Sequence, residues 1–263
     1  MAKNNRRFDE DKILDDMMSV NSEAEIARIK TQINKHLPKV IKIVAKNESQ
    51  KKLINSIRNK EITICAGPPG TGKTFVSVAY ALSLLRKKEN RFKKIYLVKS
   101  VTTLKGEEIG FLKGDLDEKI KPVMWSFMIN MEKIITSNSI TQLFEEDVIR
   151  PFPLAYMKGA SLDDCIIIAD EMQNVSLDNS RTLLTRIGSD CKLILLGDIN
   201  QIDLRNKKES SLEKLLDMFG GVDEIGVINM GEEDTENVRN PLITMIEEKY
   251  NNYIEEHGNG NGK

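Results

Sequence analysis

The stretch CAGPPGTGKTF, residues 65–75, lies between the apolar run EITI and the helix-forming run VSVAYALSLL. From Gly67 to Thr74 its spacing is that of a phosphate-binding loop, G-x-x-x-x-G-K-[ST]. Glycines let backbone N–H groups close around phosphates, because a side chain at Cβ would collide with the ligand. An ordinary Gly/Pro turn is the alternative, but the strand–loop–helix context favours a nucleotide site.

The residues of this loop have predicted roles. Lys73 would neutralise charge on the β- and γ-phosphates, and Thr74 would offer its hydroxyl to Mg²⁺. The N-terminus of the helix that follows would add its dipole. The predicted nucleotide contacts in the loop are Gly67, Pro68, Pro69, Gly70, Thr71, Gly72, Lys73, Thr74 and Phe75.

Strand-like and helix-like runs alternate along the chain. Strands are expected at 61–66, 94–98, 165–169, 192–197 and 224–230, with helices at 73–88, 115–136, 177–187 and 210–218. This alternation predicts an α/β fold, with a mostly parallel sheet covered by helices on both faces. We expect a helical N-terminal extension over 1–45, the α/β domain over 46–250 and a disordered tail over 251–263.

Composition limits the classes of partner and compartment. The net charge of the 263 residues is −1, so binding to nucleic acid would need a local patch rather than bulk attraction. No apolar run approaches the roughly 18 residues of a membrane span, and the first residues lack the apolar core of a signal peptide. The 3 cysteines show no CxxC spacing and the chain has 2 histidines, which argues for buried thiols and against zinc. We therefore expect a cytoplasmic protein that does not bind membranes.

Two carboxylates follow the apolar strand at 165–169. We expect this strand to lie beside the phosphate-loop strand, so that Asp170 holds Mg²⁺ directly or through water. Glu171 would then polarise the attacking water as a general base. A strand that ends in solvated acids is the alternative.

Two glutamines are further candidates. Gln201, in LLGDINQID, follows a strand at the edge where open α/β sheets bind ligands, and it could sense the γ-phosphate and orient water. Gln50, 17 residues before Gly67, carries an amide that could read adenine. A solvated loop is the alternative for Gln201, and a surface helix is the alternative for Gln50.

Seven segments resemble the PhoH family in their order along the chain: GPPGTGKT, GFLKGDLDEKIKP, PLAYMKGASL, DEMQN, LTRIG, GDINQIDL and ENVRNPL. The resemblance covers about residues 45–250. It implies a RecA-like core related to superfamily 1 helicases, and it implies that the protein hydrolyses ATP. It also points to RNA as the polymer that the protein binds. The residues that match the family's site by position are Gln50, Lys73, Thr74, Asp170, Glu171 and Gln201.

The chain also departs from the family pattern. KSVTT, residues 99–103, stands where the family usually shows Arg-Pro. The long N-terminal portion of bacterial members is missing, so the chain looks similar to the compact members that bacteriophages encode. That origin would place it in the host cytoplasm.

The nucleic-acid contacts predicted from helicase cores lie in the loop after the second strand. This loop would grip the phosphate backbone through charges and hydroxyls, with a solvated turn as the alternative. A basic run at 86–94 lies next to the same strand, and Trp125 is expected in the core rather than stacked on a base. The candidate contacts are Lys99, Thr102, Thr103 and Lys105.

These observations favour an ATPase that couples hydrolysis to RNA binding, remodelling or unwinding. A small-molecule kinase and a nucleotide switch or assembly scaffold are the alternatives. Superfamily 1 helicases complete the ATP site with an arginine from a second lobe, and the residues after 240 cannot build one. We therefore expect a head-to-tail ring, most simply a hexamer, in which a neighbour supplies the arginine. Arg239 is the first candidate, and Arg186 and Arg205 are the alternatives.

Overall fold

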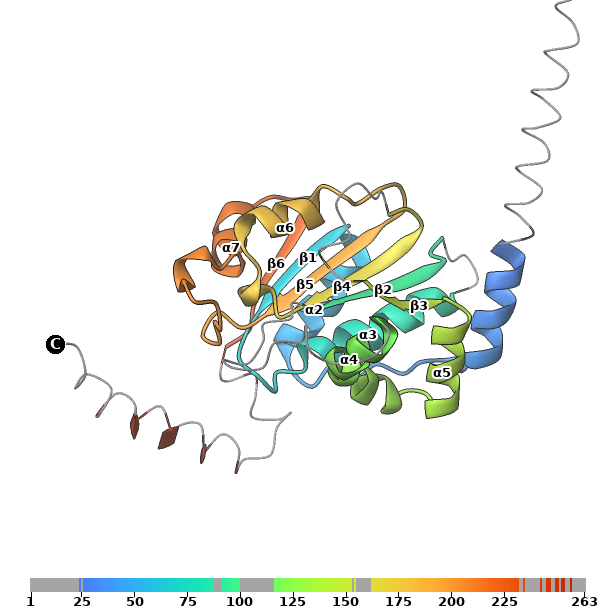
Figure 1. Cartoon of the computed structure of the whole chain (residues 1–263), viewed down its shortest axis with the longest axis horizontal. Helices are drawn as coiled ribbons and strands as arrows, with labels where there is room; N and C mark the ends of the chain where they lie inside the picture. The colour runs from blue at the N-terminus through green and yellow to red at the C-terminus, as the bar shows by residue number, and fades with distance from the viewer. Residues whose placement is uncertain are drawn as a thin grey trace, which may run out of the picture.

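The computed structural model describes residues 26–87, 91–99, 116–152 and 162–231, together with isolated positions near these ranges. At its centre is a six-stranded sheet with the order β3-β2-β4-β5-β1-β6, in which every hydrogen-bonded pair of strands is parallel (Figure 1). The strands are β1 (Ile62–Ala66), β2 (Lys94–Lys99), β3 (Ile149–Pro151), β4 (Cys165–Asp170), β5 (Lys192–Gly197) and β6 (Ile225–Asn229).

Helices cover both faces of the sheet. The helices α2 to α5 lie on one face, and α6 and α7 lie on the other (Figure 1). Their bounds are α2 (Glu48–Asn59), α3 (Lys73–Arg86), α4 (Leu116–Glu132), α5 (Ser137–Glu145), α6 (Leu177–Leu184) and α7 (Leu212–Phe219), with single 3₁₀ turns at Met172–Asn174 and Lys207–Glu209. The α/β, RecA-like fold expected from the sequence is confirmed.

The central strands β4 and β5 are apolar at all positions between their first and last residues because both of their faces are buried. In β4, Ile166 and Ile168 pack with α2 to α5, while Ile167 and Ala169 pack with α6 and α7. Successive side chains of a strand point to opposite faces, so one strand contributes to two separate cores. The three cysteines are buried free thiols, as their positions in apolar runs predicted.

The expected position of the acid-bearing strand is wrong. β1 pairs with β5 and β6, whereas β4 pairs with β5 and β2, so β5 lies between the phosphate-loop strand and the strand of Asp170. The apolar pattern identifies each buried strand but does not distinguish its neighbours, because β1, β4 and β5 are all buried. As a result, β5 ends between the strand that leads into the phosphate loop and the strand that carries the acids.

Two predictions for the segment 115–136 also needed correction. The helix stops at Glu132 and a second one, α5, begins after Thr136, whose side chain accepts a hydrogen bond from the N–H of Ser139. Trp125 is 60% exposed rather than part of the core. The buried side of α4 carries Met124, Phe127 and Met131 instead. The short edge strand β3 was not predicted.

A helix over residues 26–36 packs on the domain beside α5 (Figure 1). Ile33 and Leu37 are buried in the same core as α3 and α4, and Nε2 of His36 lies 3.2 Å from a carboxylate oxygen of Glu146. Residues 1–23 of the predicted extension lie outside the described residues. Among the helices that the structure describes, none is long and apolar enough to cross a membrane.

Candidate active site

A cavity of about 520 Å³ lies at the carboxyl edge of the sheet, where β4 and β5 end beside the phosphate loop. Side chains reach it from α2, the phosphate loop, α4 and the loops after β4 and β5. The residues that line it are Val44, Lys46, Gln50, Pro69, Gly70, Gly72, Lys73, Thr74, Phe75, Ser126, Asn130, Lys133, Asp170, Glu171, Gly197, Asp198 and Gln201. The cavity therefore brings together most of the residues predicted from the sequence.

The phosphate loop owes its shape to glycines. Gly70 and Gly72 have φ values of 87° and 84°, in the left-handed region where glycine is favoured. Gly72 caps α3 without a side-chain hydrogen bond, so no side chain of the cap satisfies the first N–H groups of this helix. A helix start of this kind is suited to bind an anion.

Gly67 contributes to the packing around the phosphate loop, and its contact with a nucleotide stays a prediction. A Cβ at this position would lie 2.6 Å from Cβ of Met230, in the segment that follows β6. The N–H of Gly67 is also used, because it donates to the carbonyl of Gly197 at 3.1 Å. This glycine therefore joins the loop to the neighbouring strands.

Lys73 lies inside the phosphate loop and is 9% exposed. Its Nζ donates to the carbonyl oxygens of Gly67 and Pro68, at 2.6 and 2.8 Å. Burial lowers the pKa of Lys73 below its ordinary value, and the acids Asp170, Asp198 and Glu171 act in the opposite direction. The ammonium of Lys73 thus links the backbone of the phosphate loop from inside. It lies at the position where the phosphates of a nucleotide would bind.

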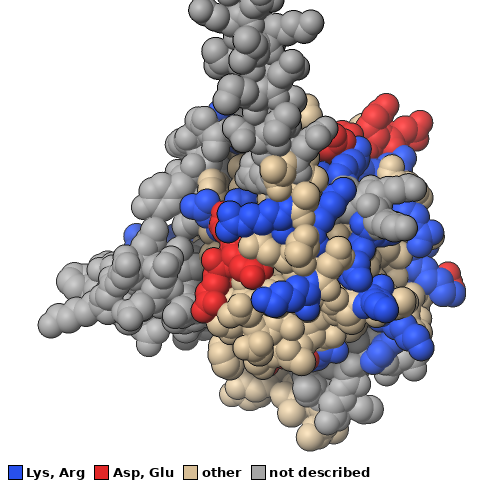
Figure 2. All heavy atoms as spheres, turned by 90° about the vertical axis from the view of Figure 1, so that its right-hand side faces the viewer, with Lys and Arg blue, Asp and Glu red and all other residues tan. Residues whose placement is uncertain are grey.

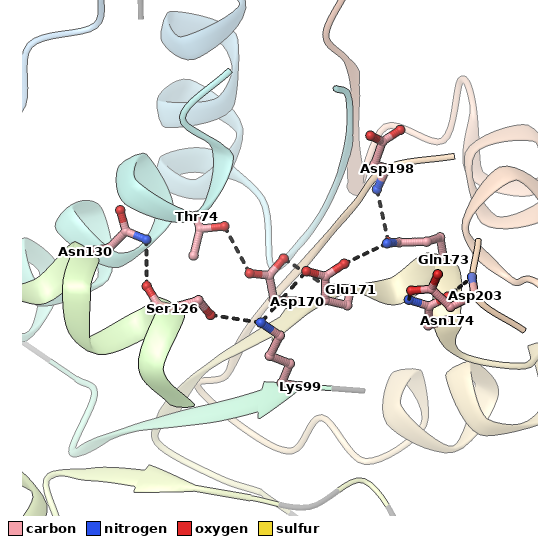
Figure 3. Close-up of polar contacts among 10 residues, drawn as sticks. All are labelled: Thr74, Lys99, Ser126, Asn130, Asp170, Glu171, Gln173, Asn174, Asp198 and Asp203. Atoms are coloured by element: carbon pink, nitrogen blue, oxygen red, sulfur yellow. Dashed lines mark hydrogen bonds and ion pairs between the residues drawn. The ribbon is translucent and has the colours of Figure 1, made fainter. Parts of the chain in front are cut away.

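Asp170 and Thr74 form a pair of oxygen ligands. Oγ1 of Thr74 donates to Oδ2 of Asp170 at 3.0 Å, although the two residues come from different elements (Figure 3). Burial, and next the charge of Glu171, raise the pKa of Asp170 above its ordinary value. Hard oxygen donors beside a buried carboxylate that lacks full charge compensation are suited to Mg²⁺, which retains water ligands of its own. The residues present therefore fit the predicted ion.

Glu171 is held in place by a chain of hydrogen bonds that ends on β5. Its Oε2 accepts from Nε2 of Gln173 at 2.7 Å, and Oε1 of Gln173 accepts from the N–H of Asp198 at 3.0 Å (Figure 3). Gln173 is fully buried. Glu171 itself has a φ of 60°, a left-handed conformation that is uncommon for a side chain of its size. The sheet therefore orients this carboxylate toward the cavity.

Sequence reasoning missed Gln173 and Asp198, although both lie in the quoted motifs DEMQN and GDINQIDL. A second amide lies nearby: Asn174 donates to a carboxylate oxygen of Asp203 at 3.2 Å and accepts from its N–H at 2.7 Å. These contacts hold the loop that carries Gln201, which is exposed at the cavity rim. The available signal in the sequence was an amide, Gln173, just after the acids of DEMQN, and a carboxylate, Asp198, just after the strand at 192–197.

Gln50 is 3% exposed, so the surface-helix alternative is wrong. Its Nε2 donates to the carbonyl of Thr71 at 2.8 Å, and its Oε1 accepts from the N–H of Lys46 at 2.9 Å. Both ends of the amide thus join the segment before α2 to the phosphate loop. Gln50 lines the cavity, and its contact with adenine stays a prediction.

Lys99 faces the acids of the cavity. Its Nζ donates to Oγ of Ser126 at 3.0 Å and lies 3.8 Å from Oε1 of Glu171 (Figure 3). The neighbouring strands β2 and β4 place it in register with Asp170. The structure therefore links the Lys99 side chain to the candidate base, and its contact with nucleic acid stays a prediction.

Of the remaining predicted residues, four have no described position. Thr102, Thr103, Lys105 and Arg239 lie outside the described residues. Arg186 lies at the amino edge of the sheet, where its carbonyl accepts from the N–H of Leu162 just before β4. Arg205 is exposed in the loop after β5. The cations of the basic run that follow residue 90 form ion pairs: Arg91 with Asp190, Lys93 with Asp164 and Lys94 with Asp147.

Comparisons with known proteins agree with these motifs. The family model described as PhoH-like protein matches residues 42–251. A PhoH-like protein of Bacillus subtilis is 35% identical over 208 residues, which is 79% of this chain and 64% of the relative. Protein PhoH of Escherichia coli is 30% identical over 194 residues, which is 73% of this chain and 54% of the relative.

A solved structure of the large terminase from a thermophilic bacteriophage, in complex with ADP, aligns with 77% of this chain and 49% of its own. The TM-score is 0.40 and the identity is 14%. The matched part of this chain spans 64% of the length of the Bacillus subtilis relative and 54% of the length of the Escherichia coli relative. Since the family model covers most of the sequence, the chain belongs to the PhoH-like protein family.

Proposed function

We propose that this protein binds and hydrolyses ATP and couples hydrolysis to RNA binding or remodelling. The observation that carries the hydrolytic part is the meeting of Thr74 and Asp170, whose side-chain oxygens lie 3.0 Å apart beside the phosphate loop. Glu171 follows directly and is oriented toward the same cavity. A phosphate loop, an oxygen pair for a metal and a positioned base are the parts that ATP hydrolysis requires.

Each residue has one task in the proposed reaction. The start of α3 and Lys73 bind the β- and γ-phosphates. Thr74 and Asp170 would hold Mg²⁺, which when bound neutralises charge on the phosphates. Glu171 accepts a proton from the attacking water, and Gln201 orients this water from the cavity rim. The contact of Gln173 with β5 keeps the carboxylate of Glu171 in place.

The coupling to RNA rests on the RecA-like core and on the resemblance to superfamily 1 helicases. ATP turnover measured with single-stranded RNA, with single-stranded DNA and with no polymer tests it. We expect RNA to raise the rate about tenfold or more. A rate that no polymer changes would favour the nucleotide switch or scaffold. Transfer of phosphate to a small acceptor would favour the kinase.

None of the described residues that line the cavity of the proposed site is an arginine. Among the described residues that line the cavity, the cations are Lys46, Lys73 and Lys133. An arginine added by a neighbour in a ring, most simply a hexamer, would complete the site, with Arg239 as the first candidate. Mixing inactive Lys73→Ala and Arg239→Ala subunits should restore part of the activity. A fully active monomer in sedimentation would rule out the shared site.

Lys99 offers a test of how charge at the proposed site is balanced around Asp170. Replacing it with Met removes a cation that lowers the pKa of Asp170, so this pKa should rise further. We expect kcat to fall about tenfold, with the acidic limb of its pH profile moved to higher pH and KM for ATP little changed. Lys99→Arg retains the charge and should retain most of the rate. If Lys99→Met weakens RNA binding without changing kcat or the pH profile, Lys99 belongs to the polymer site instead.

A further inference from the structure

Residues 26–46 carry a concentration of positive charge that the functional site does not explain. This segment contains six lysines and arginines and no aspartate or glutamate, in a chain whose net charge is −1. We call its cations the cationic track. They are Arg28, Lys30, Lys35, Lys39, Lys42 and Lys46.

The fold presents these charges to solvent. After the helix at 26–36, the segment 41–46 runs toward α2 with alternating exposure, so that Ile41 and Ile43 pack on the core while Lys42 is exposed. Five of the six cations are exposed, and Lys30 is half-buried. Figure 2 faces the side that carries the helix at 26–36, and it shows many Lys and Arg side chains and few acids on the visible surface.

The cations of the track lack acidic partners, in contrast to the cations at the start of β2. Arg91, Lys93 and Lys94, at the start of β2, each form an ion pair. Within the described part of the chain, no side chain of the track forms an ion pair or a hydrogen bond. Uncompensated charges along one segment repel one another, and a ligand with a row of negative charges relieves this repulsion.

The chemistry of the segment favours a nucleic acid over a membrane surface. A helix that lies on a membrane inserts its apolar side among the lipids. Here that side is already used, since Ile33 is 2% exposed, Leu37 is 4% exposed and Ile29 packs against the core. The large apolar side chains that the segment leaves exposed, Val40 and Val44, lie after this helix rather than on one helical face, and five of the six cations are exposed with them. A row of exposed cations suits a phosphate backbone.

The track also ends at the cavity. Lys46 lines the cavity, and its N–H donates to Oε1 of Gln50, whose Nε2 donates to the carbonyl of Thr71 in the phosphate loop. A ligand bound at Lys46 would therefore be connected to the phosphate loop through the two hydrogen bonds of Gln50. This continuity offers a physical path by which polymer binding would affect nucleotide binding.

We propose that the cationic track binds the phosphate backbone of single-stranded nucleic acid, without reading its sequence. The inference rests on the proposed function, for which it names a polymer site. Residues 26–41 lie outside the segment that the family model matches. The site thus differs from the loop after β2, which the sequence indicated first.

Two variants with the same net charge test the proposal. The track variant replaces Arg28, Lys35, Lys39 and Lys42 with Gln, and the control variant replaces Lys51, Lys52, Lys207 and Lys208, which are also exposed. Fluorescence anisotropy measures the binding of a labelled RNA of about 16 nucleotides at about 50 to 200 mM salt. We expect the track variant to lose about 10²-fold or more in affinity at low salt. Its salt slope should fall by up to about 3, since each contact with a single strand contributes about 0.7.

The other measurements separate the possible outcomes. The control variant should bind RNA like the wild type, and both variants should unfold at the wild-type temperature and hydrolyse ATP normally without RNA. An equal loss of RNA affinity in both variants, or no RNA binding by the wild type, would overturn the proposal that the track binds nucleic acid. So would binding to phosphatidylserine vesicles that only the track variant loses, with RNA binding intact. If RNA stimulates ATP turnover equally in all three proteins, the proposed function stands and the track alone fails.

Discussion

Replacing Glu171 with Gln is expected to slow ATP hydrolysis by about 10²- to 10⁴-fold while ATP still binds. The amide oxygen of the new side chain can accept the hydrogen bond that Gln173 now donates at 2.7 Å, so the local geometry is retained. The amide, however, cannot take a proton from water. Single-turnover hydrolysis and the Kd for ATP measure the two effects separately.

Two further variants sharpen this result. Glu213→Gln makes the same chemical change at an exposed position of α7 and should leave turnover unchanged. Glu171→Asp retains the charge but withdraws the carboxylate by one methylene, so it should also be slow. Wild-type turnover in Glu171→Gln would remove Glu171 from the role of base.

The second large effect is expected at Lys73. Lys73→Ala should abolish measurable ATP binding, which corresponds to a loss of about 10²-fold or more in affinity. The variant loses the charge that would meet the phosphates, and the carbonyls of Gly67 and Pro68 lose their donor. Titration with a fluorescent ATP analogue measures the affinity, and thermal unfolding checks that the domain is folded.

Lys133→Ala is the matched control for this change, because it removes the same charge from the same cavity. Nζ of Lys133 lies over the ring of Phe75, 5.9 Å from its centre, rather than inside the phosphate loop. Its loss should therefore weaken ATP binding much less. Equal effects of the two substitutions would mean that Lys73 contributes only a general positive charge.

The phosphate loop could be predicted from the sequence because its parts are contiguous. The glycines, Lys73 and Thr74 follow one another at the spacing that the chemistry requires, and the flanking apolar runs identify the strand and the helix. Asp170 could be expected near the phosphate loop because both follow the carboxyl ends of predicted strands, although the expected pairing of these strands was wrong. Local patterns therefore predicted most of the residues that line the cavity.

The parts that could not be predicted depend on which segments become neighbours. The order of the buried strands follows from pairings between distant segments, so the insertion of β5 between β1 and β4 left no local signal. The same pairings place Lys99 in register with Asp170. Trp125 was misplaced for another reason: the run VMWSFMINM is apolar at most positions, so its periodicity does not define one buried face of the helix.

The contact between Gln173 and β5 also limits how this protein can vary. A Cβ at Gly197 would lie 2.5 Å from Oε1 of Gln173 and 2.7 Å from a methyl group of Leu212. A larger residue at position 197 would push the glutamine away from both the N–H of Asp198 and the carboxylate of Glu171. A substitution of Gly197 alone should therefore be selected against during evolution. A side chain should be tolerated at position 197 only when the residue at position 173 changes with it.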